Sequence, residues 1–132
     1  METFDVRTRE RNQLIEITDR VRQVLRKSSI SRGACIVYCP HTTAAITINE
    51  NADPDVVYDM LLWLNQSIPK EQSGFRHGEG NSDSHIKASL IGSSVTVLVE
   101  HDDLVLGRWQ GVYFCEFDGP RTRTVHVQIL GS

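Results

Sequence analysis

The sequence predicts an α+β fold built largely from antiparallel strands. Short apolar runs dominate the chain, and many of them alternate with period two between Gly, Pro, Asn or Asp residues. The helical patterns do not alternate with these runs as βαβ units, which disfavours a doubly wound parallel sheet. Two further runs are apolar at nearly every position, which is typical of strands covered on both faces.

The predicted strands are the segments in which apolar residues recur at strand spacing. They lie at residues 3–6, 13–17, 33–39, 44–49, 94–100, 104–107, 111–117 and 124–130. The runs that are apolar almost throughout are "GACIVYC" and "GVYFCEF". In a chain this short, one of the layers that cover these strands could be another subunit.

A first helix is predicted after the strand at residues 13–17. Its apolar side chains fall on one face at helical spacing and are Ile17, Val21, Val24 and Leu25. Thr18 is the expected N-cap, because a threonine hydroxyl can accept a hydrogen bond from a free amide of the first turn. We expect this helix to cover one face of a sheet.

The second helix carries the clearest start and stop signals. Asp53 can cap it, Pro54 suits the first helical position, and Pro69 ends it. Its apolar residues repeat at helical spacing and are Val57, Met60, Leu61, Leu64 and Ile68.

The third helix is predicted to be short. Asn81 or Ser82 can cap it, and Asp83 suits its positive end. Ile86 and Leu90 share a face, and Gly92 is expected to close the helix in a left-handed conformation.

Length and charge bound the organisation of the protein. The chain has 132 residues, about the length of one domain, so we expect a single domain over residues 1–132. Its 17 acidic and 14 basic residues give a net charge of -3, without the positive excess that draws proteins to nucleic acids or anionic membranes. No apolar run approaches the roughly 20 residues of a membrane span, and the N-terminus has no hydrophobic signal core. We therefore expect a cytoplasmic protein with neither nucleic acid nor membrane as a partner.

The cysteines do not form a recognisable redox or metal motif. Cys35, Cys39 and Cys115 are odd in number, and each lies in an apolar run rather than in a C-x-x-C spacing. We expect buried, reduced thiols.

Two polar motifs carry the histidines of greatest interest. His41 precedes the strand at 44–49, while His77 and His85 flank a segment in which two glycines allow a tight turn. Three neutral imidazoles suit an open metal site, with zinc preferred by the nitrogen ligands. The spacing alone is not specific, and solvated surface histidines remain the alternative. Both motifs adjoin a helix N-terminus, where backbone amides accept anions.

The third motif supplies arginines. Arg121 and Arg123 follow a "DGP" turn and share the parity of Val125 and Val127, so they are expected to emerge at the strand's start, before the core closes over that face. Their planar donors suit a phosphate, although solvated turn arginines are the alternative. His126 has the outward parity and is assigned to the surface or a subunit interface. His101, between two strands, is read as a turn residue.

Taken together, the segments "CPHTTAAITINENADPDV", "RHGEGNSDSHIKASLIG" and "LGRWQGVYFCEFDGPRTRTVHVQ" resemble the motifs of the YjbQ-like family, also called secondary thiamine-phosphate synthase enzymes. The resemblance covers nearly the whole chain. It implies a β-sandwich-like fold with mainly antiparallel sheets and two to three helices, assembled as a homotrimer. It also implies a metal-binding pocket near a subunit interface and a weak thiamine phosphate synthase activity, a transfer that releases pyrophosphate.

The matching positions assign roles to individual residues. His41, His77 and His85 are the expected ligands of a divalent metal, zinc or alternatively magnesium. Glu50 and Asp53 are expected as catalytic or general-base groups. The residues expected to bind the phosphate of a small metabolite are Thr42, Thr43, Asn81, Arg121 and Arg123.

Two other functions remain open. One is metal-assisted hydrolysis of a small phosphorylated or acylated metabolite, with Glu50 or Asp53 as the base. The other is a non-catalytic trimer that binds a metal or a small anion.

Overall fold

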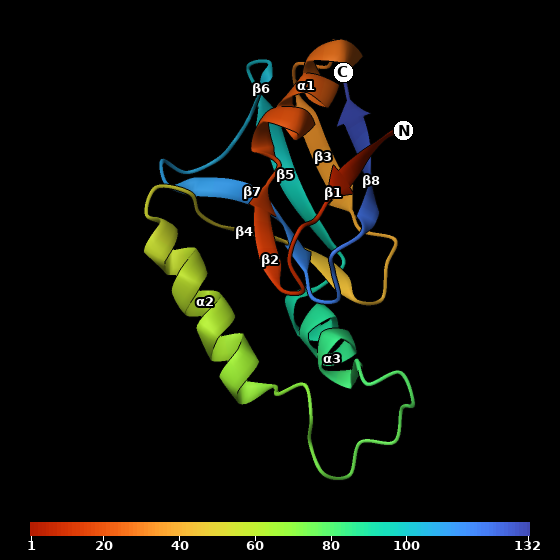
Figure 1. The fold of residues 1–132 in the computed structure, drawn as a ribbon. Coiled ribbons are helices and arrows are strands. Elements are labelled where there is room, and N and C mark those ends of the chain that lie inside the picture. The colour runs from red at the N-terminus through yellow and green to blue at the C-terminus, as the bar shows by residue number, and fades with distance from the viewer.

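The structure, a computed structural model, describes all of residues 1–132 and contains both sheets and helices (Figure 1). The strands are β1 (Glu2–Arg7), β2 (Gln13–Glu16), β3 (Gly33–Tyr38), β4 (Ala44–Glu50), β5 (Ser94–Glu100), β6 (Asp103–Leu104), β7 (Gln110–Glu116) and β8 (Thr122–Gly131). The helices are α1 (Thr18–Ser28), α2 (Pro54–Ser67) and α3 (Ser82–Ile91). Each strand matches its predicted run to within two residues at either end, except that β6 shares only Leu104 with the run at 104–107.

The strands form two antiparallel sheets. One has five strands in the order β1-β8-β3-β5-β6, and the other has three in the order β2-β7-β4. The predicted α+β fold with mainly antiparallel sheets is therefore confirmed. Two segments far apart in sequence, β1 and β8, lie side by side at one edge of the larger sheet (Figure 1).

The main core lies between the two sheets and is closed at one end by α1. The larger sheet contributes Val37, Val97 and Val125, and the smaller sheet contributes Ile46 and Phe114. The apolar face predicted for the first helix packs here: Ile17, Val21, Val24 and Leu25 are all buried.

The two runs predicted to be covered on both faces behave differently. Strand β7 is buried at every position from Gly111 to Glu116, because Phe114 faces the main core while Cys115 packs against the helices. Strand β3 is covered on one face only within the chain, and Tyr38 is 44% exposed. The prediction is confirmed for β7 and wrong for β3 in the single chain, because no helix covers the outer face of the larger sheet.

Helix α1 does not use its expected cap. Thr18 is the first helical residue, and the cap position is Ile17, which provides no side-chain hydrogen bond. The Thr18 hydroxyl instead donates to Glu16 Oε2 at 2.9 Å and accepts the backbone N–H of Val112 at 2.9 Å. The cap prediction is wrong because a neighbouring strand takes the hydroxyl.

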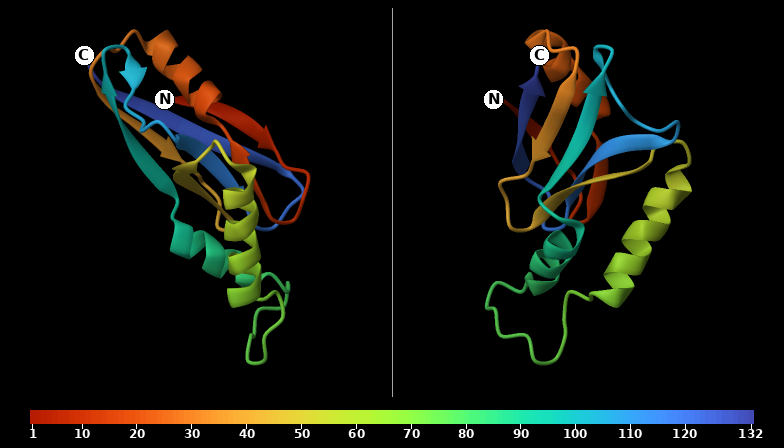
Figure 2. Two further views of the ribbon diagram at one scale, coloured as in Figure 1. Left: turned by 90° about the vertical axis from the view of Figure 1, so that its left-hand side faces the viewer. Right: turned by 180° about the vertical axis from the view of Figure 1, so that it is seen from behind.

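Helix α2 begins as predicted but is less covered than expected. The Asp53 carboxylate accepts the N–H of Asp55 at 2.9 Å, and Pro54 is the first helical residue. Of its apolar residues, only Leu64 is buried, while Trp63 is 63% exposed. The helix begins near the end of β4 and extends beyond the sheets on the side where α3 lies (Figures 1 and 2).

Helix α3 also departs from the predicted details. Asn81 occupies the cap position but makes no cap hydrogen bond with its side chain. Gly92 has φ 104° and ψ 157°, a positive φ outside the left-handed helical region that was predicted. The face with Ile86 and Leu90 is exposed, and the buried residues of the helix are Asp83, Ser84, Lys87 and Ala88.

The remaining predictions about the chain concern its cysteines and its helices. All three cysteines are free and buried, which confirms the expected reduced thiols. The longest helix, α2, has 14 residues, and none of the helices has the length and apolar character needed to cross a membrane.

Candidate functional site

The first polar motif and helix α3 form a pocket of about 510 Å³. His41 and Thr42, from the loop between β3 and β4, line one side, and His85 and Ser89, from α3, line the other. The remaining lining residues are Ala44, Ala88, Gly92 and Ser93. The volume is in the range of small-molecule pockets, which are about 300–1,000 Å³.

His41 is held in one orientation by the backbone of β8. Its Nε2 accepts the N–H of Thr124 at 2.9 Å, so this nitrogen carries no proton. Burial and the positive charge of Arg123 both lower the pKa of His41 below its usual value, which favours the neutral ring. A neutral imidazole that accepts at Nε2 carries its proton on Nδ1. In this arrangement His41 can donate one hydrogen bond, which suits a phosphate oxygen better than a metal ion.

His77, from the segment before α3, and His85, on α3, form a close pair. Their ring centroids are 5.6 Å apart and their planes are inclined by 84°. Two imidazoles bound to one tetrahedral zinc would have centroids about 5 Å apart, given Zn–N bonds of about 2.0–2.1 Å. The pair borders a second pocket of about 480 Å³, which also contains Phe75, Ser82 and Ile86. His85 lines both pockets.

The three predicted metal ligands do not all converge within one chain. No group of three or more His, Cys, Asp or Glu side chains is arranged to hold a metal ion. The carboxylate nearest to the pair is Glu79, whose Oε2 lies 3.9 Å from Nε2 of His77. Within one chain the two rings are close to each other, but no third His, Cys, Asp or Glu side chain joins them in a metal-binding arrangement.

Arg123 is in the interior and does not emerge as predicted. Its side chain is 3% exposed and forms an ion pair with Glu116, which is fully buried. Its Nε donates to Glu116 Oε1 at 2.8 Å, and its Nη2 donates to the Thr43 hydroxyl at 2.8 Å. The predicted inward direction of the side chain was right, but the core already encloses Arg123. Thr43, also predicted to bind phosphate, is hydrogen-bonded to Arg123 instead. The pair joins β7 of one sheet to β8 of the other.

Arg121 and Asn81, both predicted to bind phosphate, meet at Asp118. The half-exposed Arg121 donates to the carbonyl oxygen of Asp118 at 2.9 Å and to its carboxylate at 3.1 Å. Asn81 donates its amide to the same carboxylate oxygen at 2.8 Å. Its Oδ1 is the only buried side-chain polar atom of the protein without a hydrogen-bond partner. Asn81 precedes α3, as predicted, and the shared contact with Asp118 brings Arg121 close to the same helix end.

Glu50 and Asp53 lie at the opposite end of β4 from His41. Strand β4 has seven residues, so its ends are about 20 Å apart. Glu50 Oε2 accepts the N–H of Asp53 at 3.2 Å, while Asp53 caps α2. Within one chain these carboxylates therefore do not reach the histidines.

A further polar contact at that end was not predicted from the sequence. Glu16 Oε2 accepts the Asn51 amide at 2.9 Å. A Cβ at Gly111 would lie 2.6 Å from that Glu16 oxygen, so the glycine makes room for the contact. Gly111 was the one residue in the sequence that could have indicated this contact, but a glycine alone does not show which side chains lie beside it.

The two histidines outside the predicted site also have defined positions. His126 lies on the outer face of the larger sheet, stacked with Tyr38 at 6.3 Å between ring centroids, and its Nδ1 is 2.8 Å from the Thr3 hydroxyl. His101 lies in the turn between β5 and β6 with φ 52°, as predicted.

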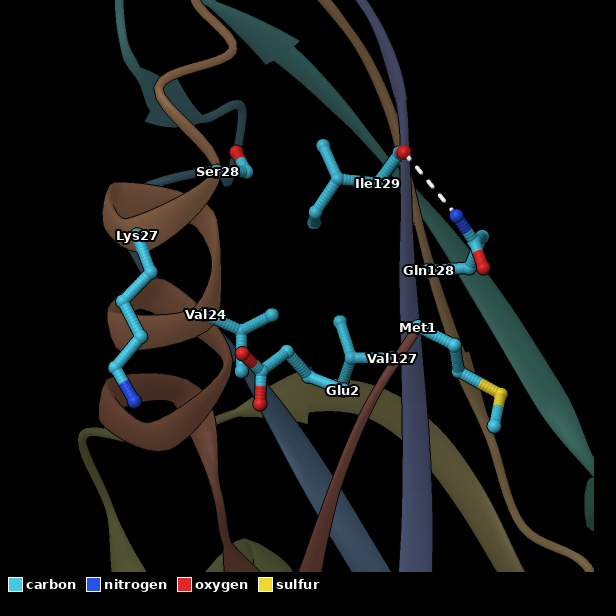
Figure 3. A pocket seen from close by; sticks show the side chains of 8 residues that line it. All are labelled: Met1, Glu2, Val24, Lys27, Ser28, Val127, Gln128 and Ile129. Atoms are coloured by element: carbon cyan, nitrogen blue, oxygen red, sulfur yellow. Dashed lines mark hydrogen bonds between the residues drawn. The ribbon is translucent and has the colours of Figure 1, made fainter.

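A separate small pocket lies between α1 and the edge formed by β1 and β8 (Figure 3). Its volume is about 150 Å³, and its lining includes Val24, Lys27 and Gln128. None of the predicted site residues contributes to it. The pocket between His41 and His85 is therefore the better candidate for a functional site.

Comparison with known proteins assigns the chain to a family. The family model described as "UPF0047 protein YjbQ-like" matches residues 2–132. The UPF0047 protein YugU of Bacillus subtilis is 50% identical over 131 residues, with 99% of each chain covered. The UPF0047 protein MJ1081 of Methanocaldococcus jannaschii is 46% identical over 129 residues, covering 98% of this chain and 93% of the relative.

Solved structures agree with this assignment. A crystal structure of a YjbQ/UPF0047 family protein from Clostridium acetobutylicum has a TM-score of 0.97 at 50% identity, covering 98% of this chain and 100% of its own. A YbjQ-like protein from Sulfolobus solfataricus has a TM-score of 0.95 at 33% identity, covering 99% of this chain and 96% of its own. The resemblance predicted from the motifs is confirmed, and the chain belongs to the YjbQ-like UPF0047 family.

Proposed function

We propose that this protein binds a small phosphorylated metabolite in the pocket between His41 and His85, next to a divalent metal held by His77 and His85. The observation that carries the proposal is the fixed, neutral His41, which offers an N–H donor on a pocket that His85 also lines. One residue, His85, then links the anion site to the metal site. Thr42 and Ser89 line the same pocket with hydroxyl groups. Arg121, which lies outside that lining and is bonded to Asp118, is proposed as a further partner of the phosphate charge.

The metal proposal rests on the nitrogen ligands and their spacing. The centroid distance of 5.6 Å between His77 and His85 is compatible with two ligands of one ion, and imidazole favours zinc over magnesium. A bound metal would supply Lewis-acid stabilisation of negative charge on the phosphate. His41 is assigned to the anion rather than to the metal, because the Thr124 N–H occupies its free lone pair.

A homotrimer is proposed because the chain leaves two apolar surfaces uncovered. On the outer face of the larger sheet, Leu98 and Leu130 are 63% and 51% exposed, and on α2, Tyr58 and Trp63 are 65% and 63% exposed. A closed ring uses two different patches of each subunit. With α2 seated on a neighbour's sheet, Glu50 and Asp53 at its start would approach the neighbour's histidines and provide the missing carboxylate.

The reaction proposed is the one that the family name suggests, a transfer that releases pyrophosphate, as in thiamine phosphate synthesis. In this transfer the carbon–oxygen bond to pyrophosphate breaks and a bond to the thiazole nitrogen forms, with no proton released. Arg121 and the amides at the start of α3 would stabilise the departing pyrophosphate, and Glu50 or Asp53 would stabilise the positive charge that develops on the organic groups. Hydrolysis of a phosphorylated metabolite is the second candidate; here Glu50 or Asp53, brought in by a neighbouring subunit, would take the proton of the attacking water.

The test compares wild type with His85→Ala, using His101→Ala as the matched control in an exposed turn. Zinc content is measured by elemental analysis and pyrophosphate binding by calorimetry. We expect His85→Ala to lose both, and His101→Ala to lose neither. Pyrophosphate binding that survives His85→Ala would contradict the proposed pocket, while release of pyrophosphate from a pyrimidine diphosphate only in the presence of a thiazole phosphate would support the synthase reaction.

The phosphate contact of Arg121 has its own test. Arg121→Lys keeps the charge but loses the planar fork, so phosphate affinity should fall by about 1–3 kcal/mol. Zinc content should not change, since an arginine does not bind a cation. Equal affinities of wild type and variant would remove Arg121 from the site.

The assembly is tested by light scattering. Leu98→Lys and Tyr58→Lys place a charge on the two proposed patches and should yield monomers. Leu90→Lys changes a residue of α3 that is 67% exposed and belongs to neither patch, and it should leave the trimer intact. A wild-type mass equal to one chain at micromolar concentration would refute the trimer.

A further inference from the structure

Helix α3 buries its polar face against the rest of the protein, which is unusual for a helix of a small domain. Its buried residues include Asp83, Ser84 and Lys87, whereas Leu90 is 67% exposed. The Lys87 side chain is 1% exposed and that of Asp83 is fully buried. The orientation of α3 therefore depends on hydrogen bonds and charge pairs more than on apolar contacts.

Lys87 uses all three of its donors. Its Nζ donates to Asn12 Oδ1 at 3.1 Å, to Asn65 Oδ1 at 2.8 Å and to Asp83 Oδ2 at 3.1 Å. These acceptors come from the loop between β1 and β2, from α2 and from α3 itself. Lys87 Nζ is thus the point at which three separate segments meet.

The other residues of the buried face continue this connection. Arg11 donates to both oxygens of Asp83, each at 2.9 Å. The Ser84 hydroxyl donates to the carbonyl oxygen of Phe117 at 2.6 Å, immediately after β7. Each contact has a directional requirement, so together they set both the rotation of α3 about its axis and its depth in the fold.

The rotation of α3 determines where His85 points. At about 100° per residue, His85 lies roughly 180° around the helix from the midpoint of Asp83 and Lys87. A buried polar face on one side therefore directs His85 outward on the other, where it contacts His77 and borders both pockets. Charged pairs of this kind stabilise a fold no better than apolar packing would, but they can specify one arrangement.

We propose that Lys87, with Asp83 and Arg11, is a positioning residue for His85, and that it fixes the helix rotation at which His85 stands beside His77. The contact between the two rings follows from the structure alone. The consequence for metal binding rests on the function proposed above.

The main variant is Lys87→Met, which keeps the unbranched apolar stem and removes the ammonium. Asp83 retains its two hydrogen bonds from Arg11, so no charge is left without a partner. The matched control is Leu25→Ala, a core substitution in α1 that destabilises the fold away from α3. Asn65→Ala, which removes one acceptor of Lys87 on an exposed stretch of α2, serves if Lys87→Met does not fold.

The first measurement is the ring-to-ring NOE between His77 and His85 in protein with labelled histidine. We expect the NOE in wild type and in Leu25→Ala, and its loss in Lys87→Met or weakening in Asn65→Ala. The second is zinc affinity by calorimetry, expected to fall about tenfold in Lys87→Met and to stay unchanged in Leu25→Ala.

The outcomes separate this inference from the proposed function. An NOE that persists in Lys87→Met and Asn65→Ala, or is absent in wild type, overturns the positioning role whatever the zinc result. Wild-type protein that binds no zinc but loses the NOE on substitution of Lys87 supports the positioning role and refutes the metal site.

Discussion

Replacing Arg123 by methionine should expose how strongly the interior depends on one ion pair. Glu116 is fully buried, and Arg123 provides its neutralising charge. The variant keeps the apolar stem and leaves Glu116 with two donors, the Thr8 hydroxyl at 2.8 Å and the N–H of Asp118 at 2.9 Å. Removing one partner of a buried pair costs about 3–5 kcal/mol, and the two remaining donors place the expected loss near the lower end, at about 3 kcal/mol.

The loss of unfolding free energy in Arg123→Met should depend on pH. In wild type, burial acts to raise the pKa of Glu116, but hydrogen bonds from Arg123, Asp118 and Thr8 outweigh it and hold the pKa below its usual value. This carboxylate therefore adds stability above the unfolded-state pKa of about 4.3, and the contribution disappears as the pH falls through the lower folded-state pKa. In Arg123→Met, burial outweighs the remaining hydrogen bonds and raises the pKa of Glu116. The free-energy cost of the unpaired carboxylate is therefore present at high pH and is relieved when acidification protonates it.

The assay is urea unfolding followed by circular dichroism at fixed protein concentration, at about pH 7.5 and about pH 5. The difference in unfolding free energy between wild type and Arg123→Met should be largest at the higher pH. Arg121→Met is the control, because Arg121 is 50% exposed and its pair with Asp118 should contribute less than about 1 kcal/mol. A loss below about 1 kcal/mol in Arg123→Met, or a loss equal at both pH values, would refute a buried carboxylate that depends on Arg123.

Two further predictions concern the backbone and the thiols. Gly33→Ala should destabilise the protein by about 3 kcal/mol or more in the same assay. The new Cβ would lie 1.9 Å from the carbonyl oxygen of Leu130, and the φ of residue 33 is 154°. A loss of unfolding free energy below about 1 kcal/mol would show that the paired strands can separate. Burial raises the pKa of Cys35 to about 11 and also raises the pKa values of Cys39 and Cys115, so Ellman's reagent at neutral pH should label no thiol in the native protein and all three after denaturation. Rapid labelling of a native thiol would contradict this.

The strands could be predicted because their signal is local. Alternation of apolar residues places Val125 and Val127 on the inward face of β8, and both are buried. The continuous apolar run at 111–117 predicted cover on both faces, which β7 has. In each case the periodicity of neighbouring residues is enough, because a strand turns successive side chains to opposite sides whatever it pairs with.

The polar contacts could not be predicted in the same way, because their partners are distant in the sequence. Thr18 and Asn81 both satisfy the local pattern of a helix cap, yet Thr18 bonds to Val112, 94 residues away, and Asn81 to Asp118, 37 residues away. A side chain that can cap a helix can equally bond to a strand, and the packing of the sheets decides between the two. Asp53, at the exposed start of α2, has no such competitor and caps as predicted.

The misplacement of Arg123 has the same origin and bears on the anion site. The inward direction of Arg123 was predicted, and Glu116 shares the strand face of Val112 and Phe114. The two strands belong to different sheets, however, so neither pattern shows that these side chains meet. Because the guanidinium already serves Glu116 and Thr43, a phosphate could use it only by leaving a buried carboxylate unpaired, at a cost of about 3–5 kcal/mol that exceeds the roughly 1–3 kcal/mol of one charge-assisted contact. Arg121, whose partner Asp118 remains partly solvated, carries no such penalty. Of the two arginines that the motif offers, the outer one is therefore the residue whose replacement should weaken phosphate binding, while the inner one should act on stability.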